Sequence, residues 1–378
     1  MSHFVISALS AVAYGGYTYF RNLLPMLAKV DPVNRYTILV KPGHLGELKV
    51  RADNMVFMPV PAAGASAAKR TVWEQRVLPR SLKEWHADAV YTANNVGILR
   101  CEVPVVIAVR NLEPFFFHKY ADDRGLRLRN RALRWLTLCS VRKATRVVVV
   151  SEYTRDVVSG ECDGCGDKMR VIYHGRPLIA PDEEAASRLK ARLGLGGEYF
   201  LANSKFVPYS NLHTLIEGYG RAVERDPRLP KLVLAGGDAS RHYKERILEA
   251  IRTLRLQERV VLAGLVPYPA NLALIRGAKL FLFPSLLEAC PNTLIEAMTM
   301  GCVVVSSDRP PMREIAGDSV LYFRSEDPAD LAEKIHDACG LTEEAASLFR
   351  SSAHRRSLGF TWEESARRLV SVLEEAAG

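Results

Sequence analysis

No apolar run in the sequence approaches the ~18 residues that a membrane-spanning helix needs, so we expect no such helix. The opening stretch, MSHFVISALSAVAYGGYTYF, lacks the basic start of a secretory signal, and Ser and Gly interrupt its apolar run. We expect it to form a first strand and a loop. Low-complexity tracts are also missing, and 48% hydrophobic with 25% charged residues is typical of a globular protein.

Cysteine is sparse and scattered, with seven residues and no repeated spacing. The odd count excludes a simple disulfide framework, and the apolar surroundings of Cys139, Cys290 and Cys302 indicate a reducing cytoplasm. Cys162 and Cys165 form a single C-x-x-C. Without a second pair we expect a polar loop that carries two thiols, and a zinc or redox role is the alternative.

Acidic residues are few in the first half of the chain. Residues 1–180 contain 26 Lys and Arg against 15 Asp and Glu, whereas residues 181–378 contain 25 against 27. The basic first half predicts an anionic partner, which is nucleic acid, an anionic lipid surface or an acidic acceptor. At 378 residues the chain exceeds the usual size of one core, so we expect two domains.

Short β-branched runs alternate with helical patterns along the whole chain. Nearly continuous apolar runs suit parallel strands covered on both faces, and the alternation predicts an α/β fold of two doubly wound domains. A Pro-bearing linker, a polar helix pattern and a Gly pair mark a boundary within residues 175–198. Ligands are expected beyond the carboxyl ends of the strands. The expected strands are HFVISAL, RYTILV, NMVFMPV, AVYTA, VPVVIAV and RVVVVS, then KLVLAGG, RVVLAGLV, KLFLFPS and CVVVSSD.

Glycine and proline stand at several of the expected strand ends. Gly15 and Gly16 precede the helical pattern TYFRNLLPML, where backbone amides can approach an anion; an ordinary tight turn is the alternative. In the second half, two buried strands lead to Asp238 and to Pro267-Tyr268. Their shared position at strand ends favours one common site.

The stretch FPSLLEACPNTLIEAM places Glu288 at an expected strand end and Glu296 about one turn into a helix opened by Pro291. Unpaired amides of residues 292–294 would then form an anion site suited to a phosphate. Carboxylates on both sides suit the hydroxyl groups of a sugar nucleotide. The alternative is that both are solvated glutamates that support the helix dipole and cap.

Several motifs in register carry a family resemblance. FLFPSLLEACPNTLIEAMTMGCVVVSSD contains a strand, a Pro-Ser-x-x-Glu turn and Glu-x7-Glu, and REIAGDSVLYF follows it. The stretches GGYTYFRNLLPML, VVVVSEYTRDVV, VIYHG, NLHTLIEGY, LVLAGG, RVVLAGLVP and FTWEESARRLV occur in the same order as in the family. Over nearly its whole length the sequence resembles the family 4 (group 1) glycosyltransferases, which are retaining enzymes of the GT-B fold.

The resemblance implies the GT-B fold, with two Rossmann-like doubly wound domains facing a central cleft. We expect an acceptor-binding domain over residues 1–182, a donor-binding domain over 183–360, and a helix over 361–378 that crosses back to the first domain. The implied activity is hexosyl-type transfer from a UDP- or GDP-sugar to a saccharide, lipid-linked or small-molecule acceptor, with the anomeric configuration retained. No cofactor beyond this co-substrate and no metal is expected, since the sequence has no Asp-x-Asp.

The resemblance also implies roles for individual residues. Glu288 contacts sugar hydroxyls near the reacting carbon, Glu296 binds the ribose, and Val266 lies beside the nucleobase. Gly16 directs its amide toward the diphosphate from the opposing domain. The implied catalytic set is Glu288, Arg110 and Asn111, and the implied donor-binding set is Gly15, Gly16, Ser204, Lys205, Val266, Ala289, Cys290, Asn292, Thr293, Leu294 and Glu296.

Two positions depart from the family pattern. Ser210 stands where the family has its second base for the diphosphate, so Lys205 either supplies that charge or is a solvated loop residue. Arg110 and Asn111 stand where many members have a His-Asp pair, and neither is a neutral base at pH 7. This is compatible with a leaving phosphate that takes the acceptor proton. Glu113 is a helper or a loop cap, and Arg110 alternatively reads a carboxylate or phosphate on the acceptor.

Residues 124–146 carry eight Arg or Lys and predict an amphipathic helix with a cationic stripe. Its apolar positions are Leu128, Ala132, Trp135 and Cys139, and its cationic stripe is Arg124, Arg127, Arg131 and Arg134. Either the apolar face packs on the domain, or the helix attaches to an anionic leaflet with about 1 kcal/mol from each base. The expected location is the cytoplasm, at the inner face of the membrane in the second case.

Two other functions are compatible with parts of the sequence. The basic charge suits a nucleic-acid-binding protein, but the interleaved aromatic and basic residues of single-strand binders are missing, so no nucleic acid is expected. Ser210 suits a glycosyltransferase-like protein that has lost turnover.

Overall fold

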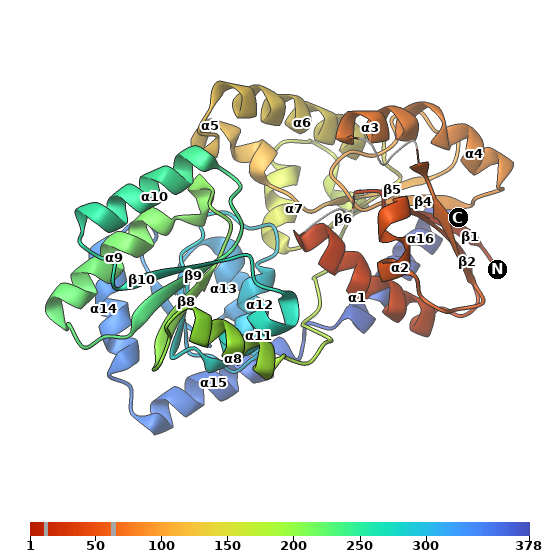
Figure 1. The fold of residues 1–378 in the computed structure, drawn as a ribbon. Helices are drawn as coiled ribbons and strands as arrows, with labels where there is room; N and C mark the ends of the chain where they lie inside the picture. Colours follow the sequence, from red (N-terminus) through yellow and green to blue (C-terminus); the bar gives the residue numbers. More distant parts are fainter. Residues whose placement is uncertain (11–13, 62–65) are drawn as a thin grey trace. The chain divides into compact units, whose positions relative to one another are not determined.

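The computed structural model describes residues 1–10, 14–61 and 66–378 (Figure 1). The chain forms two compact units. The first comprises Met1–Phe117, Gly125–Gly175 and Thr361–Gly378, and the second comprises His118–Arg124 and Arg176–Phe360.

These limits differ from the predicted domains in two places. The long segment of the first unit ends at Gly175 rather than at residue 182, and Gly175 packs so tightly that an added Cβ would lie 2.3 Å from the backbone N of Trp362. The short segment His118–Arg124 belongs to the second unit, where Ser240 Oγ donates to Asp122 at 2.5 Å. The segment after residue 360 belongs to the first unit.

The first unit is built on a seven-stranded parallel sheet in the order β3-β2-β1-β4-β5-β6-β7. Its central strands are apolar because helices cover both faces, and all five residues of β5 are buried. The strands are β1 (His3–Ser7), β2 (Arg35–Val40), β3 (Met55–Pro59), β4 (Ala89–Thr92), β5 (Val105–Val109), β6 (Arg146–Val149) and β7 (Met169–Val171).

Two helices from opposite ends of the chain share the core of this unit. Leu369 and Leu373 of α16 lie in one buried cluster with Phe20 and Leu23 of α1. Thr361 caps α16 by accepting a hydrogen bond from the backbone N–H of Glu364 at 3.1 Å. The helices are α1 (Tyr14–Val30), α2 (Leu45–Leu48), α3 (Ala67–Arg76), α4 (Leu78–Glu84), α6 (Arg124–Lys143), α7 (Glu152–Ser159) and α16 (Trp362–Ala377), and α5 (Phe117–Tyr120) begins where the first unit gives way to the second.

The second unit has a six-stranded parallel sheet in the order β10-β9-β8-β11-β12-β13. The strands are β8 (Tyr199–Asn203), β9 (Lys231–Ala235), β10 (Val260–Gly264), β11 (Leu280–Phe283), β12 (Val304–Ser307) and β13 (Leu321–Phe323). The helices are α8 (Glu183–Arg192), α9 (Leu212–Arg225), α10 (Arg241–Thr253), α11 (Tyr268–Gly277), α12 (Asn292–Thr299), α13 (Pro310–Ala316), α14 (Pro328–Cys339) and α15 (Glu343–Ser357).

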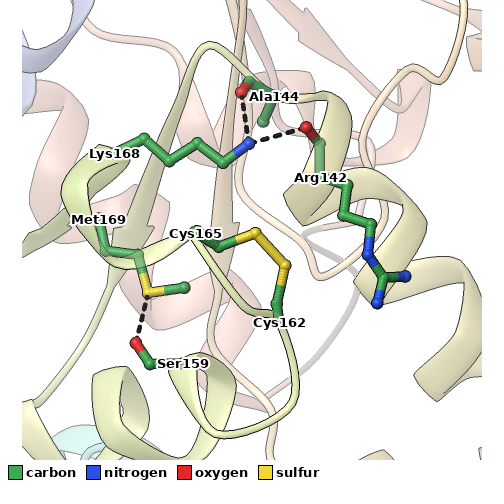
Figure 2. The surroundings of a disulfide bond; sticks show 7 residues. All are labelled: Arg142, Ala144, Ser159, Cys162, Cys165, Lys168 and Met169. Carbon is green, nitrogen blue, oxygen red and sulfur yellow. Dashed lines mark hydrogen bonds between the residues drawn. A yellow bond between two sulfur atoms is a disulfide. The ribbon is translucent and has the colours of Figure 1, made fainter.

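The C-x-x-C segment differs from its prediction as a loop with two thiols. Cys162 and Cys165 are 1% and 4% exposed and form a disulfide. The turn between them, in which the Cys165 N–H donates to Cys162 O at 3.1 Å, places their Cα atoms 5.6 Å apart. Just beyond the bond, Lys168 Nζ donates to the carbonyl oxygens of Arg142 and Ala144, at 2.8 and 3.2 Å (Figure 2). The loop therefore caps the end of α6 with a cation.

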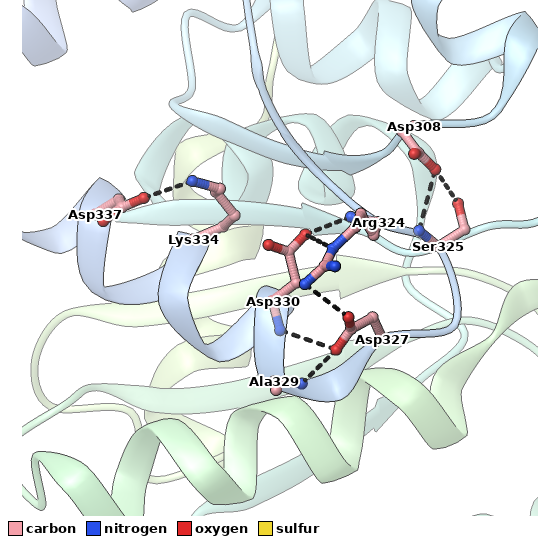
Figure 3. Close-up of polar contacts among 8 residues, drawn as sticks. All are labelled: Asp308, Arg324, Ser325, Asp327, Ala329, Asp330, Lys334 and Asp337. Carbon is pink, nitrogen blue, oxygen red and sulfur yellow. Dashed lines mark hydrogen bonds and ion pairs between the residues drawn. The ribbon is translucent and has the colours of Figure 1, made fainter.

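An acidic group at the end of the second sheet has local partners for its carboxylates (Figure 3). Asp308 accepts from Ser325 N–H at 3.0 Å and from its hydroxyl at 2.6 Å. Asp327 caps α14, and Asp330 accepts from the Arg324 N–H at 2.5 Å. These bonds fasten the β13–α14 turn to the loop after β12, so the group has a structural role.

None of the helices in the described part of the chain has the length and apolar character that a membrane span requires.

Gly236 occupies a position that only glycine fits. Its φ is +141°, and an added Cβ would lie 1.9 Å from the carbonyl oxygen of Ser204. We expect Gly236→Ala to lower the free energy of unfolding by at least about 2 kcal/mol, measured by denaturant unfolding. Gly194→Ala is the matched control: its φ is +65° but its Cβ meets open space, so the loss should stay near 1 kcal/mol. Equal losses in the two variants would contradict the clash.

Candidate functional site

The polar residues of the second unit gather where its strand order reverses. β8 pairs with β9 on one side and with β11 on the other, so the loops after β8 and β11 leave the same edge in opposite directions. Two hydrogen bonds join these loops: Leu286 N–H donates to Tyr209 O at 2.8 Å, and Asn211 Nδ2 donates to Pro284 O at 3.1 Å. The contact between Gly236 and Ser204 adds the loop after β9.

Glu288 lies in the loop after β11, as predicted from the sequence. Its carboxylate accepts a hydrogen bond from Ser285 Oγ at 2.8 Å. Burial raises its pKa to about 7, against the opposing effects of this bond and of the positive charge of Lys205. At neutral pH this carboxyl group is therefore partly protonated and partly ionised.

Glu296 lies in α12 and is only 9% exposed. Burial raises its pKa to about 7 as well, and a hydrogen bond from Tyr268 opposes the shift. Tyr268 opens α11, directly after β10, so the contact crosses between elements far apart in the sequence. The interpretation as a solvated helix-terminus residue is wrong for Glu296, which is buried, whereas Glu288 is partly buried in its loop.

The loop after β8 contains Lys205 in an exposed position and Ser210 in a buried one. Ser204 Oγ donates to Ser210 Oγ at 2.7 Å. At position 210, where the family pattern predicts a base, the protein therefore has a buried hydroxyl group that is bonded to a second hydroxyl group. Lys205 lies near enough to Glu288 to affect its pKa. The structure thus places this cation within electrostatic range of the Glu288 carboxylate. Among the residues that the structure describes, no three His, Cys, Asp or Glu side chains are grouped to bind a metal ion.

The start of α12 differs from the prediction of three free amides. Pro291 is the N-cap, but the Asn292 N–H donates to Cys290 O at 2.9 Å, and the Leu294 N–H donates to Pro291 O at 3.1 Å. Within the described residues, the Thr293 N–H is the one of the three that makes no backbone hydrogen bond. A tight turn around Pro291 therefore uses two of the donors that were assigned to an anion.

The remaining donor residues of the second unit lie beside this edge. Ala289 and Cys290 are 8% and 7% exposed and continue the loop from Glu288 into α12. Val266 is half-buried and follows β10. The structure therefore gathers the predicted residues of this unit on the loops after β8, β10 and β11 and in α12.

The residues predicted in the first unit gather at the equivalent edge of its own sheet. Gly15 and Gly16 lie in the first turn of α1 rather than in a loop before it. Arg110 Nη2 donates to Gly15 O at 3.1 Å, Nη1 donates to Ala93 O at 3.2 Å, and the guanidinium lies 3.7 Å from the centre of the Tyr19 ring. Arg110 thus joins the segments after β1, β4 and β5, with its charge fixed by a cation–π contact.

Asn111 and Glu113 stabilise the turn after β5. The Asn111 side chain accepts from the Glu113 N–H at 2.9 Å, and Asn95 Oδ1 accepts from the Asn111 N–H at 3.1 Å. Glu113 in turn accepts from Asn130 Nδ2 at 2.9 Å. These bonds favour a loop-forming role for Glu113, one of the two alternatives considered for it.

Sequence reasoning missed two side chains that shape the site, Ser285 and Tyr19, and it placed Tyr268 at the site without a role. Ser285 and Tyr268 supply hydrogen bonds to Glu288 and Glu296, and Tyr19 carries the guanidinium of Arg110. Ser285 had a detectable signal, because it precedes Glu288 in the Pro-Ser-x-x-Glu turn. Tyr19 had none, because its contact depends on packing between separate elements.

The raised pKa values predict how stability changes with pH. Both folded-state values, near 7, exceed the ordinary 4.5, so the folded protein binds more protons than the unfolded one between these limits. Each group therefore destabilises the fold as pH rises from about 5 to 7, by at most about 3 kcal/mol. Glu288→Gln and Glu296→Gln should each flatten this decline in denaturant unfolding across that range. The exposed Glu224→Gln is the control, and a decline unchanged in all three variants would contradict the assignment.

Comparisons with known sequences cover both units. The family "Glycosyl transferases group 1" matches residues 185–353, and "Glycosyltransferase Family 4" matches residues 34–178. Mannosylfructose-phosphate synthase of Agrobacterium fabrum is 27% identical over 208 residues, which cover 53% of this chain and 46% of that protein. The aligned part thus spans less than half the length of this relative.

Solved structures resemble the chain over nearly its whole length. Sucrose-phosphate synthase of Thermosynechococcus elongatus gives a TM-score of 0.74 at 16% identity, covering 99% of this chain and 98% of that one. HepE of Anabaena, solved in complex with UDP-glucose, gives 0.73 at 16% identity, covering 99% and 100%. These similarities confirm the predicted GT-B class with two Rossmann-like domains. The two family matches, one over each unit, show that the chain belongs to the family 4, group 1 glycosyltransferases.

Proposed function

We propose that the protein transfers a sugar from a nucleotide-diphosphate donor to a saccharide, lipid-linked or small-molecule acceptor, with the anomeric configuration retained and without a metal. The observation that carries this proposal is the pair of carboxyl groups with raised pKa values at the carboxyl edge of the second sheet, the partly buried Glu288 and the buried Glu296. Each has one protein hydroxyl as a hydrogen-bond donor. Each can accept further hydrogen bonds, and the hydroxyl groups of a sugar nucleotide can donate them.

In this proposal Glu296 binds the ribose hydroxyls and Glu288 binds hydroxyls of the transferred sugar. Hydrogen bonds to an ionised carboxylate lower its pKa, so donor binding offsets the cost of burying both charges. Val266 lies beside the nucleobase. The site thereby selects ligands with hydroxyl groups at two separated positions.

The leaving diphosphate is stabilised by the Lys205 charge and by backbone amides near Thr293. The bond between the anomeric carbon and the diphosphate oxygen breaks while the acceptor oxygen bonds to that carbon. The acceptor proton passes to the leaving phosphate. Arg110 of the first unit stays protonated at neutral pH and is a fixed positive charge at the edge of its own sheet.

The identity of the donor is proposed from similar proteins. The HepE structures contain UDP, UDP with glucose, or UDP-glucose, and several relatives are named mannosyltransferases. We therefore propose a UDP- or GDP-sugar as the donor. The proposed location is the cytoplasm, at the inner face of a membrane, where a lipid-linked acceptor would be available.

The first test is thermal unfolding with UDP, GDP, ADP and their sugar conjugates, without metal. A ligand at about 100 times its dissociation constant should stabilise the fold by about 2.7 kcal/mol, which raises the melting temperature by degrees. Glu296→Gln should lose most of this shift because it accepts ribose hydroxyls less well, whereas the exposed Glu224→Gln should keep it. A shift of the same size in Glu296→Gln would disprove the assigned ribose site.

Glu288→Gln should affect transfer more than donor binding. Removing one preorganised charge beside the reacting carbon should lower kcat by about 10²–10³-fold while the nucleotide-induced shift persists. The measurement is sugar transfer to a saccharide acceptor, with Glu224→Gln as the matched control. The anomeric configuration of the product, read by NMR, tests retention, and an inverted product would refute that part of the mechanism.

One observation favours a second candidate function. Ser210, bonded to Ser204, closes the position of the second base, so donor stabilisation rests on fewer cations. A protein that binds the nucleotide sugar without turning it over would show the thermal shift but neither transfer nor donor hydrolysis. Either activity in the wild-type protein, lowered in Glu288→Gln, dismisses this candidate.

A further inference from the structure

Helix α6 has its largest apolar side chains on the outside. Leu128 and Trp135 are 71% and 62% exposed, and Ala132 is exposed between them. These positions follow one another at spacings of four and three residues, so they form one stripe along the helix. The chain's other tryptophans are buried or half-buried. The apolar stripe that the sequence predicts therefore does not pack on the domain.

The opposite face of α6 is buried and carries polar anchors. Asn130, Thr137 and Ser140 are at most 1% exposed, beside the apolar Leu138 and Val141. Asn130 donates to the Glu113 carboxylate at 2.9 Å, and Ser140 Oγ accepts from the Gly97 N–H at 3.0 Å. These bonds fix the rotation of the helix, because turning the apolar stripe inward would bury charges and break them.

The flanks of the apolar stripe are cationic. α6 contains six arginines, one lysine and no acidic residue. Arg129 and Arg131 are exposed on either side of the stripe, and neither forms an ion pair with a residue that the structure describes. An exposed tryptophan and leucine between arginines match the composition of helices that lie in the interface of an anionic bilayer.

A second helix of the same unit continues this surface. Val72 of α3 and Val77 just after it are 55% and 45% exposed, and Arg76 is exposed beside them. Gly97 links the two helices, because its carbonyl accepts from Gln75 Nε2 of α3 at 2.8 Å and its N–H donates to Ser140 of α6. Both helices border the same edge of the unit in Figure 1. The apolar and cationic groups therefore form one surface rather than one isolated helix.

We propose that the surface formed by the outer faces of α6 and α3 docks on the anionic leaflet of a lipid bilayer, with Leu128 and Trp135 inserted at the headgroup level. The arginines pair with lipid phosphates while the stripe leaves water. Nucleic acid would use the arginines but would leave Leu128 in water. A lipid surface therefore accounts for both the charge and the apolar side chains, and nucleic acid for the charge alone.

The inference names the partner for the membrane location proposed above, but it does not rest on catalysis. Lipid binding by this surface needs neither Glu288 nor a nucleotide. Transfer to a soluble saccharide and binding to vesicles can be measured on the same protein, so failure of one is distinguishable from failure of the other.

The test is flotation of the full chain with phosphatidylcholine vesicles, with and without about a third of phosphatidylglycerol. The wild-type protein should float with the anionic vesicles and remain unbound with neutral ones. Leu128→Ser with Trp135→Ser should weaken binding by at least about tenfold, because the inserted apolar area is lost. Leu265→Ser with Leu348→Ser is the matched control, since both side chains are 66% exposed on the second unit, and it should bind as the wild type does.

The cationic part has its own pair of variants. Arg129→Gln with Arg131→Gln should weaken vesicle binding by about 30-fold, at about fivefold for each base. The exposed pair Arg192→Gln with Arg225→Gln is the control and should bind like the wild type. Tryptophan emission should shift to shorter wavelength on anionic vesicles, and Trp135→Phe should float normally but lose most of that shift.

Three outcomes would overturn the proposal. Docking on lipid would be disproved if the wild-type protein did not bind anionic vesicles, or if the Leu128–Trp135 serine variant bound them as its control does. The surface would be assigned to nucleic acid if the protein bound short DNA tightly but did not bind vesicles. In that case the arginine variant should weaken DNA binding and the Leu128–Trp135 variant should not. A concentration-dependent dimer that dissociates in the Leu128–Trp135 variant would assign it to a second copy of the chain.

Discussion

Because every strand in each sheet runs parallel to its neighbours, the loops that follow the strands emerge at one edge of that sheet. This constraint brings together loops after β8, β9, β10 and β11, although residues 204 and 296 are far apart in the sequence. The close approach of Gly236 to Ser204 sets how tightly these loops pack. At the other sheet, Arg110 joins the segments after β1, β4 and β5 in the same way. The chemistry of each unit is thus a consequence of its topology.

In the second unit, the removal of two carboxyl groups from water has an energetic cost. Glu296 is buried and Glu288 is partly buried, and each accepts a hydrogen bond from a protein hydroxyl group in place of water. Such groups bind a hydroxyl-bearing ligand favourably and reject an analogue that lacks the hydroxyl, because the carboxylate would then remain poorly solvated. In the proposed function, selectivity for a sugar nucleotide and reduced stability of the protein without it have the same physical origin.

Much of the fold followed from sequence patterns, and ten of the strands were predicted from apolar runs. β7 and β13 were missed because edge strands of three residues are too short to show periodicity, and β8 was missed beside the Gly pair of the boundary. Glu288 and Glu296 were placed correctly at the sheet edge, but the turn around Pro291 and the contact with Tyr268 depend on backbone angles and packing that no motif encodes. The amphipathic stripe of α6 was also visible, whereas its outward direction is set by Asn130 and Ser140 through partners elsewhere in the chain.

The return of the chain to the first unit has a consequence for synthesis. Trp362, Leu369 and Leu373 complete, with other residues of α16, a core whose remaining members come from the first half of the sequence. The ribosome synthesises residues 176–360 before these side chains. The second unit therefore has all its strands while the first unit still lacks α16, which packs beside α1 in its core. Domains usually fold in the order of their synthesis, but here the N-terminal unit must finish last. Its first strands leave the ribosome early, but the apolar surface that α16 covers stays exposed until residues 361–378 have been synthesised.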